Sequence, residues 1–134
     1  MKTLVTLFAC VVAASVAYAE AEKAPISITK PGNETKVDER PLVEGAVSNT
    51  TAVVKVVVHP METGDYWVQP NVSVKTDGTW KVQIYIGRPG DIDVGKHFEI
   101  MAFADPETNL EEGRVLSDWP KAKHKSGVVE VIRR

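Results

Sequence analysis

Apolar and polar residues alternate along much of this chain, and the alternation is clearest over residues 79–86. Every second residue of that segment is large and apolar: Trp80, Val82, Ile84 and Ile86. Successive side chains of a β-strand point to opposite faces, so this spacing predicts a strand with one buried and one solvent-facing side. Helical spacing of apolar residues is nearly absent from the rest of the chain. The alternation therefore restricts the fold to the all-β class.

The same pattern, bounded by turn residues, recurs in other segments. We predict strands at 25–29, 42–48, 53–59, 66–69, 72–75, 79–86, 97–104 and 128–132. Valine is frequent in the second and third of these, which suits a pleated strand surface and is unfavourable in a helix. Asn49-Thr50 predicts a hairpin between these two segments, and Asp77-Gly78 predicts another before residue 79. Residues 87–95 are predicted to be a turn-rich connection.

The length and composition agree with one globular domain. The chain has 134 residues, of which 43% are hydrophobic and 25% are charged, and these values are ordinary for a folded domain. About seven short strands over roughly a hundred residues, separated by turns, are typical of an antiparallel β-sandwich. We therefore predict one β-sandwich domain over residues 20–134.

Residues 1–19 have the pattern of a secretory signal peptide. Lys2 gives a positive start, residues 4–17 are an apolar run, and an Ala-Tyr-Ala cleavage sequence ends at Ala19. The apolar run is shorter than the ~20 residues of a membrane-spanning helix, and the acidic Glu20 follows it directly. We predict cleavage after Ala19 and a periplasmic or secreted protein with no membrane span in the mature chain. The compact signal favours a Gram-negative bacterium as the source.

Cys10 allows a second interpretation of the N-terminus, as a lipoprotein signal with Cys10 as the lipidated residue. The apolar segment before Cys10 is short for that pattern, and the bulky Phe8 fits it poorly. Cys10 is also the single cysteine of the chain. Cleavage after Ala19 would thus leave a mature chain without a disulfide or a thiol nucleophile, stabilised by its apolar core alone.

The charge balance argues against nucleic acid as a partner. The chain has 16 Lys and Arg against 18 Asp and Glu, a formal net charge of -2 and a pI of ≈ 5.9. Binding to DNA or RNA rests on clustered cations that neutralise phosphates. We therefore predict that the protein does not bind nucleic acid.

The residue types that carry catalysis or hold metals do not form a recognisable constellation. His59, His97 and His124 are far apart in the sequence and have no second ligand at a metal-binding spacing. Asp91 and Asp93 lie in an Asp-x-Asp-x-Gly run that resembles a calcium loop, but the remaining ligand positions are missing. No serine lies in a Gly-x-Ser-x-Gly elbow. We therefore predict a non-enzymatic protein with no metal site and no cofactor.

Residues 41–47 have the sequence PLVEGAV, and residues 77–82 have the sequence DGTWKV. This V-x-G-x-V strand and D-G-x-W hairpin resemble those of bacterial immunoglobulin-like domains of exported proteins. The resemblance covers most of residues 26–104, and the chain lacks the cysteine pair of antibody domains. It implies an immunoglobulin-like β-sandwich with a role in adhesion or binding, and it implies no catalytic residues.

Residues 105–127 are the longest segment without a clear period. The first half of the segment is acidic, the second half is basic, and Leu116 and Trp119 lie between the two halves. A long connection of this kind inside a domain is more often functional than idle. We expect one short helical turn in it, over residues 116–119.

Exposed aromatic side chains are the best candidates for contact with a ligand. Tyr66 and Trp67 are neighbours in a predicted strand, so one of them points outward. We predict a binding face formed by that residue and Trp119, with Lys121 and Lys123 beside them. The alternative is that Trp119 folds back onto the edge of the sandwich, and the sequence leaves both open.

Three asparagines lie in Asn-x-Ser/Thr sequences: Asn33, Asn49 and Asn71. Such sequences are glycosylation acceptors in eukaryotes. In a bacterial protein they indicate turns that precede strands.

These observations together predict an exported, non-enzymatic, immunoglobulin-like binding module whose ligand is an unidentified protein or glycan. The alternative is a carbohydrate-binding module or a small secreted enzyme inhibitor, for which a similar sandwich would serve.

The export interpretation predicts where the mature protein begins. Because the cleavage sequence ends at Ala19, we expect the exported chain to start at Glu20. Mass spectrometry of the protein recovered from the periplasm or medium measures this directly. An intact chain starting at Met1, or a lipid attached to Cys10, would contradict the prediction.

Overall fold

The computed structural model describes residues 24–134, which form eleven β-strands in two sheets. The predicted signal peptide, residues 1–19, lies outside the described residues. Between residues 24 and 134, no helix is long and apolar enough to cross a membrane.

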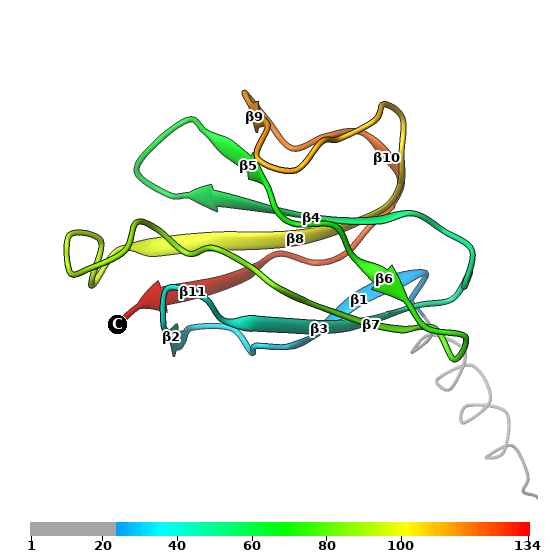
Figure 1. The fold of residues 1–134 in the computed structure, drawn as a ribbon, viewed down its shortest axis with the longest axis horizontal. Helices are drawn as coiled ribbons and strands as arrows, with labels where there is room; N and C mark the ends of the chain where they lie inside the picture. The colour runs from blue at the N-terminus through cyan, green and yellow to red at the C-terminus, as the bar shows by residue number, and fades with distance from the viewer. Residues whose placement is uncertain (1–23) are drawn as a thin grey trace, which may run out of the picture.

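The strands are divided between a four-stranded and a seven-stranded sheet. In the first sheet the order is β1 (Ile26–Lys30), β3 (Leu42–Val47), β7 (Thr79–Gln83) and β6 (Ser73–Val74). In the second it is β2 (Thr35–Val37), β11 (Val129–Arg133), β8 (His97–Pro106), β4 (Val54–Pro60), β5 (Tyr66–Val68) and β9 (Val115–Leu116), and β10 (Ala122–Lys125) pairs with β8. In Figure 1 the second sheet runs from β9 at the top to β2 at the bottom.

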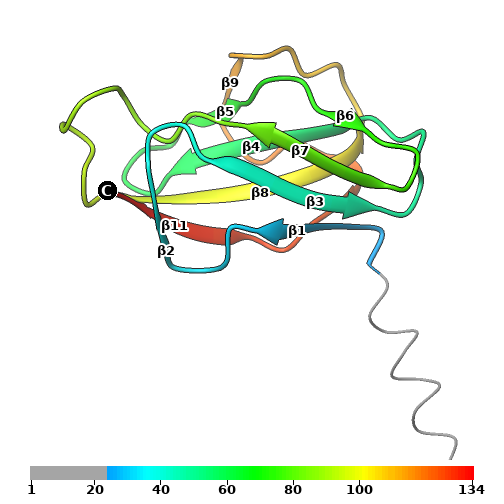
Figure 2. The same cartoon turned by 60° about the horizontal axis from the view of Figure 1, so that its bottom comes forward.

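The two sheets pack against each other as layers of a sandwich. In Figure 2 the strands β3 and β7 of the first sheet pass in front of β4 and β8 of the second. The main core between the layers includes the apolar residues of the alternating segment: Trp80, Val82, Ile84 and Ile86. All four are buried. The predictions of an all-β sandwich and of a buried face on this segment are therefore confirmed.

Strand β8 is buried on both faces. Its residues that face the main core are Phe98, Ile100, Ala102 and Ala104. Met101 and Phe103, at the alternate positions, belong to a second buried cluster on the outer face of the sheet. β4 pairs with one side of β8, and β10 and then β11 pair with the other side. This central position explains why residues 100–104 are continuously apolar instead of alternating.

Ser126 lies where the chain passes from β10 to β11 along the same side of β8. The backbone N–H of Ser126 donates to the carbonyl of Ala102 at 2.9 Å, and the Ser126 hydroxyl accepts from the Ala102 N–H at 2.9 Å. The side chain thus replaces the backbone acceptor that the irregular junction does not provide, so no hydrogen-bonding group of Ala102 is left unpaired.

The strand count differs from the prediction of about seven. Strands β2, β9 and β10 were not predicted, because they have only three, two and four residues and largely lack buried alternate positions. β2 also runs parallel to β11, whereas every other strand pair is antiparallel within the described residues. The description as a seven-stranded antiparallel sandwich is corrected in these two respects.

The predicted hairpin at Asn49-Thr50 is wrong. β3 and β4 lie in different sheets, so the connection between them crosses from one layer to the other. Asn49 still makes the expected local turn, because its Oδ1 accepts from the N–H of Thr51 at 3.1 Å. The hairpin predicted at Asp77-Gly78 is confirmed, since it joins the paired strands β6 and β7.

The three asparagines of the Asn-x-Ser/Thr sequences all accept hydrogen bonds through Oδ1. Asn49 makes the turn described above. Asn33 accepts from the backbone N–H of Glu130 at 2.8 Å, and Asn71 accepts from Nζ of Lys55 at 2.7 Å. Each of these side chains therefore has a structural role: Asn49 stabilises a local turn, and Asn33 and Asn71 join segments that are distant in the sequence.

Trp80 sets the spacing between β3 and β7. Its side chain is only 2% exposed and is the largest one fully buried in the core. Gly45 of β3 pairs with Trp80, and a Cβ at Gly45 would overlap the indole ring and the carbonyl oxygen of Ser27. The glycine of the V-x-G-x-V segment is thus required because the tryptophan of the D-G-x-W segment occupies its space.

We expect Trp80→Ala to lower the free energy of unfolding by roughly 3 to 5 kcal/mol, because it empties a large core site. Urea denaturation followed by circular dichroism measures the change. Ile92→Ala is the control, because Ile92 is 60% exposed and its truncation should change stability by less than about 0.5 kcal/mol. Equal stabilities for the two variants would contradict the placement of Trp80.

Candidate functional site

Residues 105–127 cover the outer face of the seven-stranded sheet. The second buried cluster on this face consists of Val57, Val68, Met101, Phe103 and Leu110. Leu116 and Trp119 pack against that cluster. The predicted helical turn at 116–119 is wrong, because residues 115 and 116 form β9 and pair with β5. The long segment is therefore part of the packed structure and contains two strands, β9 and β10.

Trp119 belongs to an aromatic stack with His59 and Tyr66. The rings of His59 and Tyr66 are nearly parallel, with centroids 4.1 Å apart. The Trp119 ring meets Tyr66 edge-on at 4.8 Å and His59 at 5.9 Å. Such geometries are favourable for aromatic pairs beyond the area they bury. Burial, with the carboxylates of Asp118 and Glu99, raises the pKa of the Tyr66 hydroxyl.

His59 holds this stack on β4. Its Nδ1 lies 2.9 Å from Oε1 of Glu99, and its Nε2 lies 2.8 Å from the carbonyl oxygen of Thr63. Both partners are acceptors, so both ring nitrogens donate when the imidazole carries two protons. The contacts fix the plane of the ring against which Tyr66 stacks.

Trp119 and Lys121 also line a shallow depression of about 430 Å³ on the outside of this segment. Lys123 is exposed on β10. The acidic and basic halves of the segment meet through a backbone hydrogen bond from the N–H of Glu107 to the carbonyl of Lys121 at 2.9 Å. No ion pair joins the two halves in the described part of the chain.

The structure brings Tyr66 and Trp119 together but places Trp67 elsewhere. Trp67 is the outward member of the Tyr66-Trp67 pair, with 41% of its surface exposed, and it lines a different hollow. The predicted combination of Trp119 with the outward aromatic residue therefore does not occur. Whether Trp119, Lys121 and Lys123 contact a ligand stays a prediction.

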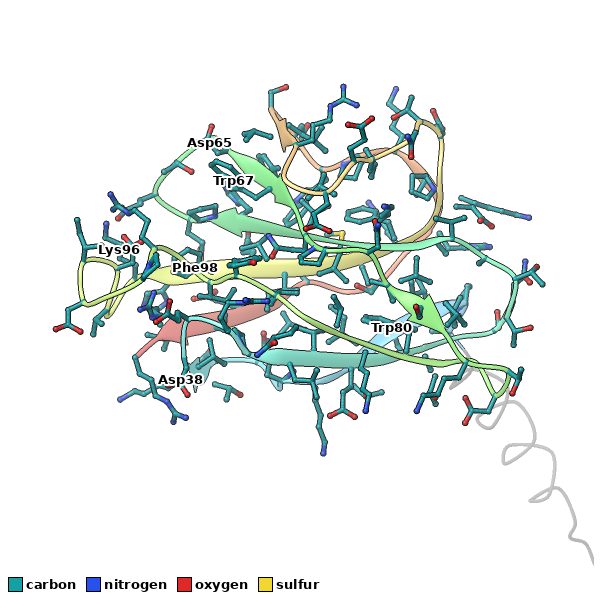
Figure 3. All side chains as sticks on the ribbon, in the orientation of Figure 1. Asp38, Asp65, Trp67, Trp80, Lys96 and Phe98 are labelled. Carbon is teal, nitrogen blue, oxygen red and sulfur yellow. The ribbon has the colours of Figure 1, made fainter. Side chains whose placement is uncertain are left out.

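A second hollow is a cleft of about 470 Å³ at the end of the sandwich where β4 turns into β5. Val58 and Phe98, both buried residues of the main core, line it. Trp67 of β5 and Tyr85, which follows β7, are exposed at its edges, and Tyr85 is 51% exposed. Figure 3 labels Trp67 beside Asp65, and Phe98 and Lys96 across from them. We call this hollow the Trp67 cleft.

Gln69 fixes the two edges of the Trp67 cleft relative to each other. Its side chain is buried, its Oε1 accepts from the backbone N–H of Tyr85 at 2.8 Å, and its Nε2 donates to the carbonyl of Trp67 at 3.1 Å. Its own N–H donates to Val56 of β4 at 2.9 Å. One buried amide therefore joins the backbones of both aromatic residues to the seven-stranded sheet.

Arg40 orients the ring of Tyr85. Its guanidinium carbon lies 3.8 Å from the ring centroid, which is a cation–π contact. Its Nε donates to the carbonyl of Ile84 at 3.1 Å, so the guanidinium is held in place from the neighbouring residue. One face of the Tyr85 ring, at the edge of the cleft, is therefore already occupied by the guanidinium of Arg40.

Arg133 anchors the connection between β7 and β8, which forms the other side of the cleft. In both views this connection extends past the sheets next to the C-terminus (Figures 1 and 2). The Arg133 side chain is buried and donates to the carbonyls of Ile86 at 2.9 Å, Arg88 at 2.8 Å and Gly90 at 2.6 Å. Hydrogen bonds to three of its carbonyl groups therefore join the connection to the last strand.

Asp93 completes this anchor from inside the connection. It is 5% exposed, and its carboxylate accepts from the side chain and the backbone N–H of Arg88 and from Nζ of Lys96. The hydrogen bonds from Arg88 hold the pKa of the Asp93 carboxyl far below its usual range. The Asp-x-Asp-x-Gly run, which resembled a calcium loop, thus uses Asp93 for an internal ion pair.

The charged groups at the rim of the cleft differ in how they are paired. Lys96 bonds to Glu62 at 2.9 Å as well as to Asp93 at 3.0 Å, and Arg88 bonds to Asp93 at 2.9 Å. Asp65 and Glu112 also line the cleft, and neither has an ion-pair partner within residues 24–134. Four carboxylates, the side chains of Arg88 and Lys96 and the imidazole of His97 therefore line the cleft, and two of the carboxylates are free of ion pairs in residues 24–134.

Most of this site was not identified from the sequence. Trp67 was predicted as a contact residue, and the structure places it at the cleft. Tyr85, Asp65 and Glu112 were missed because nothing in their local sequence indicates that the fold brings them near Trp67. The two glycines and the proline of residues 87–90 were a signal for an unusual connection, but not for its contact with the C-terminal strand.

Comparison with known proteins identifies no relatives: no family model matches the chain, and no curated protein matches it. In residues 24–134 no group of three or more His, Cys, Asp or Glu side chains is placed to hold a metal ion.

We expect Asp93→Asn to lower the free energy of unfolding by about 3 kcal/mol near neutral pH, because it removes the buried carboxylate that accepts charge-assisted hydrogen bonds from Arg88 and Lys96. The folded-state pKa of Asp93 is depressed, so its contribution is present above the ordinary aspartate pKa of about 4 and is lost as the pH falls below it. The stability difference between the wild type and the variant should therefore shrink on acidification.

Urea denaturation at a series of pH values measures this difference. Asp91→Asn is the matched control, because Asp91 is an exposed residue of the same connection and makes none of these contacts. A constant difference between wild type and Asp93→Asn across the acid range would contradict the assignment.

Proposed function

We propose that this protein is an exported, non-enzymatic binding module of the immunoglobulin-like class, and that the Trp67 cleft is its ligand site. The observation that carries the proposal is the cleft itself, a concave and mainly apolar hollow of about 470 Å³ with two exposed aromatic side chains at its edges. Hollows of this size with a few polar groups are the usual form of small-molecule sites.

The order of the strands supports the immunoglobulin-like class. Immunoglobulin domains have strands A-B-E-D in one sheet and G-F-C in the other, with C′ added beside C in variable-type domains. We assign these letters in chain order and leave out the short strands β2, β9 and β10. The order β1-β3-β7-β6 then corresponds to A-B-E-D, and the order β11-β8-β4-β5 corresponds to G-F-C-C′. The buried Trp80 lies on β7 instead of on the C strand, and the fold has no disulfide between B and F to pack on it.

The pairing of Arg88, Asp93 and Lys96 supports a structural role for these three rim charges instead of a catalytic one. A general acid, a base or a nucleophile needs a reactive side chain that is free to exchange a proton or a bond with the substrate. Arg88, Asp93 and Lys96 are instead engaged with one another in short ion pairs that hold the connection between β7 and β8. Their arrangement serves the shape of the cleft.

The N-terminal sequence supports export. The signal-peptide pattern of residues 1–19 precedes a stretch without cysteine, which folds without depending on the redox state of its compartment. A periplasmic or extracellular location gives such a cleft access to ligands outside the cell.

Carbohydrate binding is the second candidate function. Trp67 favours it, because a large exposed aromatic face at a cleft is suited to stacking on a sugar ring. The same side chain serves a protein ligand equally well as an anchor at the centre of an interface.

We expect Trp67→Ala to weaken ligand capture by at least about tenfold while leaving the fold intact, because the side chain is exposed and supplies much of the contact area. Capture is measured on a glycan array and by pull-down from periplasmic extract, with thermal unfolding followed by circular dichroism. The control is Val53→Ala, because Val53 is exposed away from the cleft.

Trp119→Ala separates the two aromatic sites. If the ligand binds in the Trp67 cleft, we expect this variant to lose stability, because Trp119 packs on the second cluster. We expect the folded fraction of the variant to bind the ligand normally. Loss of capture in a folded Trp119→Ala protein, with normal capture by Trp67→Ala, would move the site to the depression beside Lys121.

A further inference from the structure

The Trp67 cleft combines an exposed indole with carboxylates that have no ion-pair partner. Asp65 immediately precedes β5, which carries Trp67, and both residues line the cleft. Glu112 lines the cleft from the turn before β9, whose Gly113 N–H donates to the carbonyl of Val68 on β5 at 2.9 Å. Two negative charges and the face of a tryptophan therefore border the same hollow.

We infer that the Trp67 cleft binds a small organic cation, an ammonium group attached to an apolar body. This inference rests on the proposed binding role of the cleft and names the chemistry of its ligand. The cation would lie against the indole of Trp67, in a hollow that the carboxylates of Asp65 and Glu112 also border. The apolar body would lie against Val58 and Phe98, which line the cleft.

The charge of the lining favours a cation over an anion. The basic side chains of the cleft are Lys96, Arg88 and His97. Lys96 and Arg88 already bond to carboxylates at 2.9 to 3.0 Å, and Nδ1 of His97 lies 2.7 Å from the carboxylate of Glu130. An anionic ligand would have to displace one of these bonds and would also approach Asp65 and Glu112. A cation meets two uncompensated carboxylates and displaces nothing.

The aromatic edges favour a cation over a neutral ligand. The face of an indole attracts cations more strongly than that of any other side chain, and the attraction grows when the cation is desolvated. Tyr85 shows the same chemistry within the protein, because the Arg40 guanidinium lies 3.8 Å from its ring centroid. The volume of about 470 Å³ suits a small molecule.

Choline and spermidine are the probes, and isothermal titration calorimetry of the purified mature protein measures their affinity. The matched neutral probe is the carbon analogue of choline, in which a tert-butyl group replaces the trimethylammonium group. We expect at least one cation to bind at a single site. We also expect the neutral analogue of choline to bind about tenfold more weakly than choline, or not at all.

The variants test which residues recognise the charge. Asp65→Asn with Glu112→Gln should weaken cation binding by about tenfold while keeping the size of both side chains, and Trp67→Ala should abolish it. Glu107→Gln is the control, because this carboxylate lines the depression on the other surface and not the cleft. Circular dichroism establishes that each variant is folded.

Three outcomes would overturn the inference: no binding of either cation, equal binding of choline and its neutral analogue, or cation binding unchanged by the loss of the two carboxylates. In each case the proposed function is judged separately, by whether Trp67→Ala removes capture of a glycan or protein. Trp67-dependent capture without cation binding would leave the cleft as a ligand site and reject the organic cation alone.

Discussion

The paired strands β4 and β8 are buried on both faces, and the rest of the structure follows from that constraint. An antiparallel sheet commonly leaves one face in water. Here the four-stranded sheet covers the inner face, and residues 105–127 cover the outer face over Val57, Met101 and Phe103. The long segment between β8 and β11 is therefore needed to bury apolar surface, and this need accounts for the position of Trp119.

The cleft depends on a second constraint, because one of its sides is a connection outside the sheets. Buried charges such as Arg133 and Asp93 cost solvation energy, which hydrogen bonds offset. The Nε of Arg133 is buried without a partner in residues 24–134, but both of its terminal nitrogens donate. Arg133 donates hydrogen bonds to three carbonyls, and Asp93 forms ion pairs with Arg88 and Lys96. A connection fixed in this way loses little further freedom when a ligand binds, which lowers the entropic cost of binding.

The sequence predicted the features that depend on neighbouring residues and missed those that depend on packing between distant ones. The buried face of Trp80 to Ile86 and the Asp77-Gly78 hairpin follow from local spacing, and both are confirmed. The prediction of a hairpin at Asn49 was wrong because a turn residue does not indicate whether the next strand joins the same sheet or the other one. In the site, Trp67 was predicted from its type and position, whereas Tyr85 and Glu112 meet it only through the fold. No local pattern predicts that the side chain of Gln69, which follows β5, accepts a hydrogen bond from the backbone N–H of Tyr85.

The neighbours Tyr66 and Trp67 show how one dipeptide serves both constraints. Because alternate residues of a strand point to opposite faces, covering the outer face with Tyr66 forces Trp67 to the other side. β5 is three residues long, and on that side Trp67 is 41% exposed. The packing that buries Tyr66 under Trp119 thus leaves an indole exposed beside Asp65. A one-residue shift of β5 would exchange these two roles, and both the outer cluster and the cleft would be lost together.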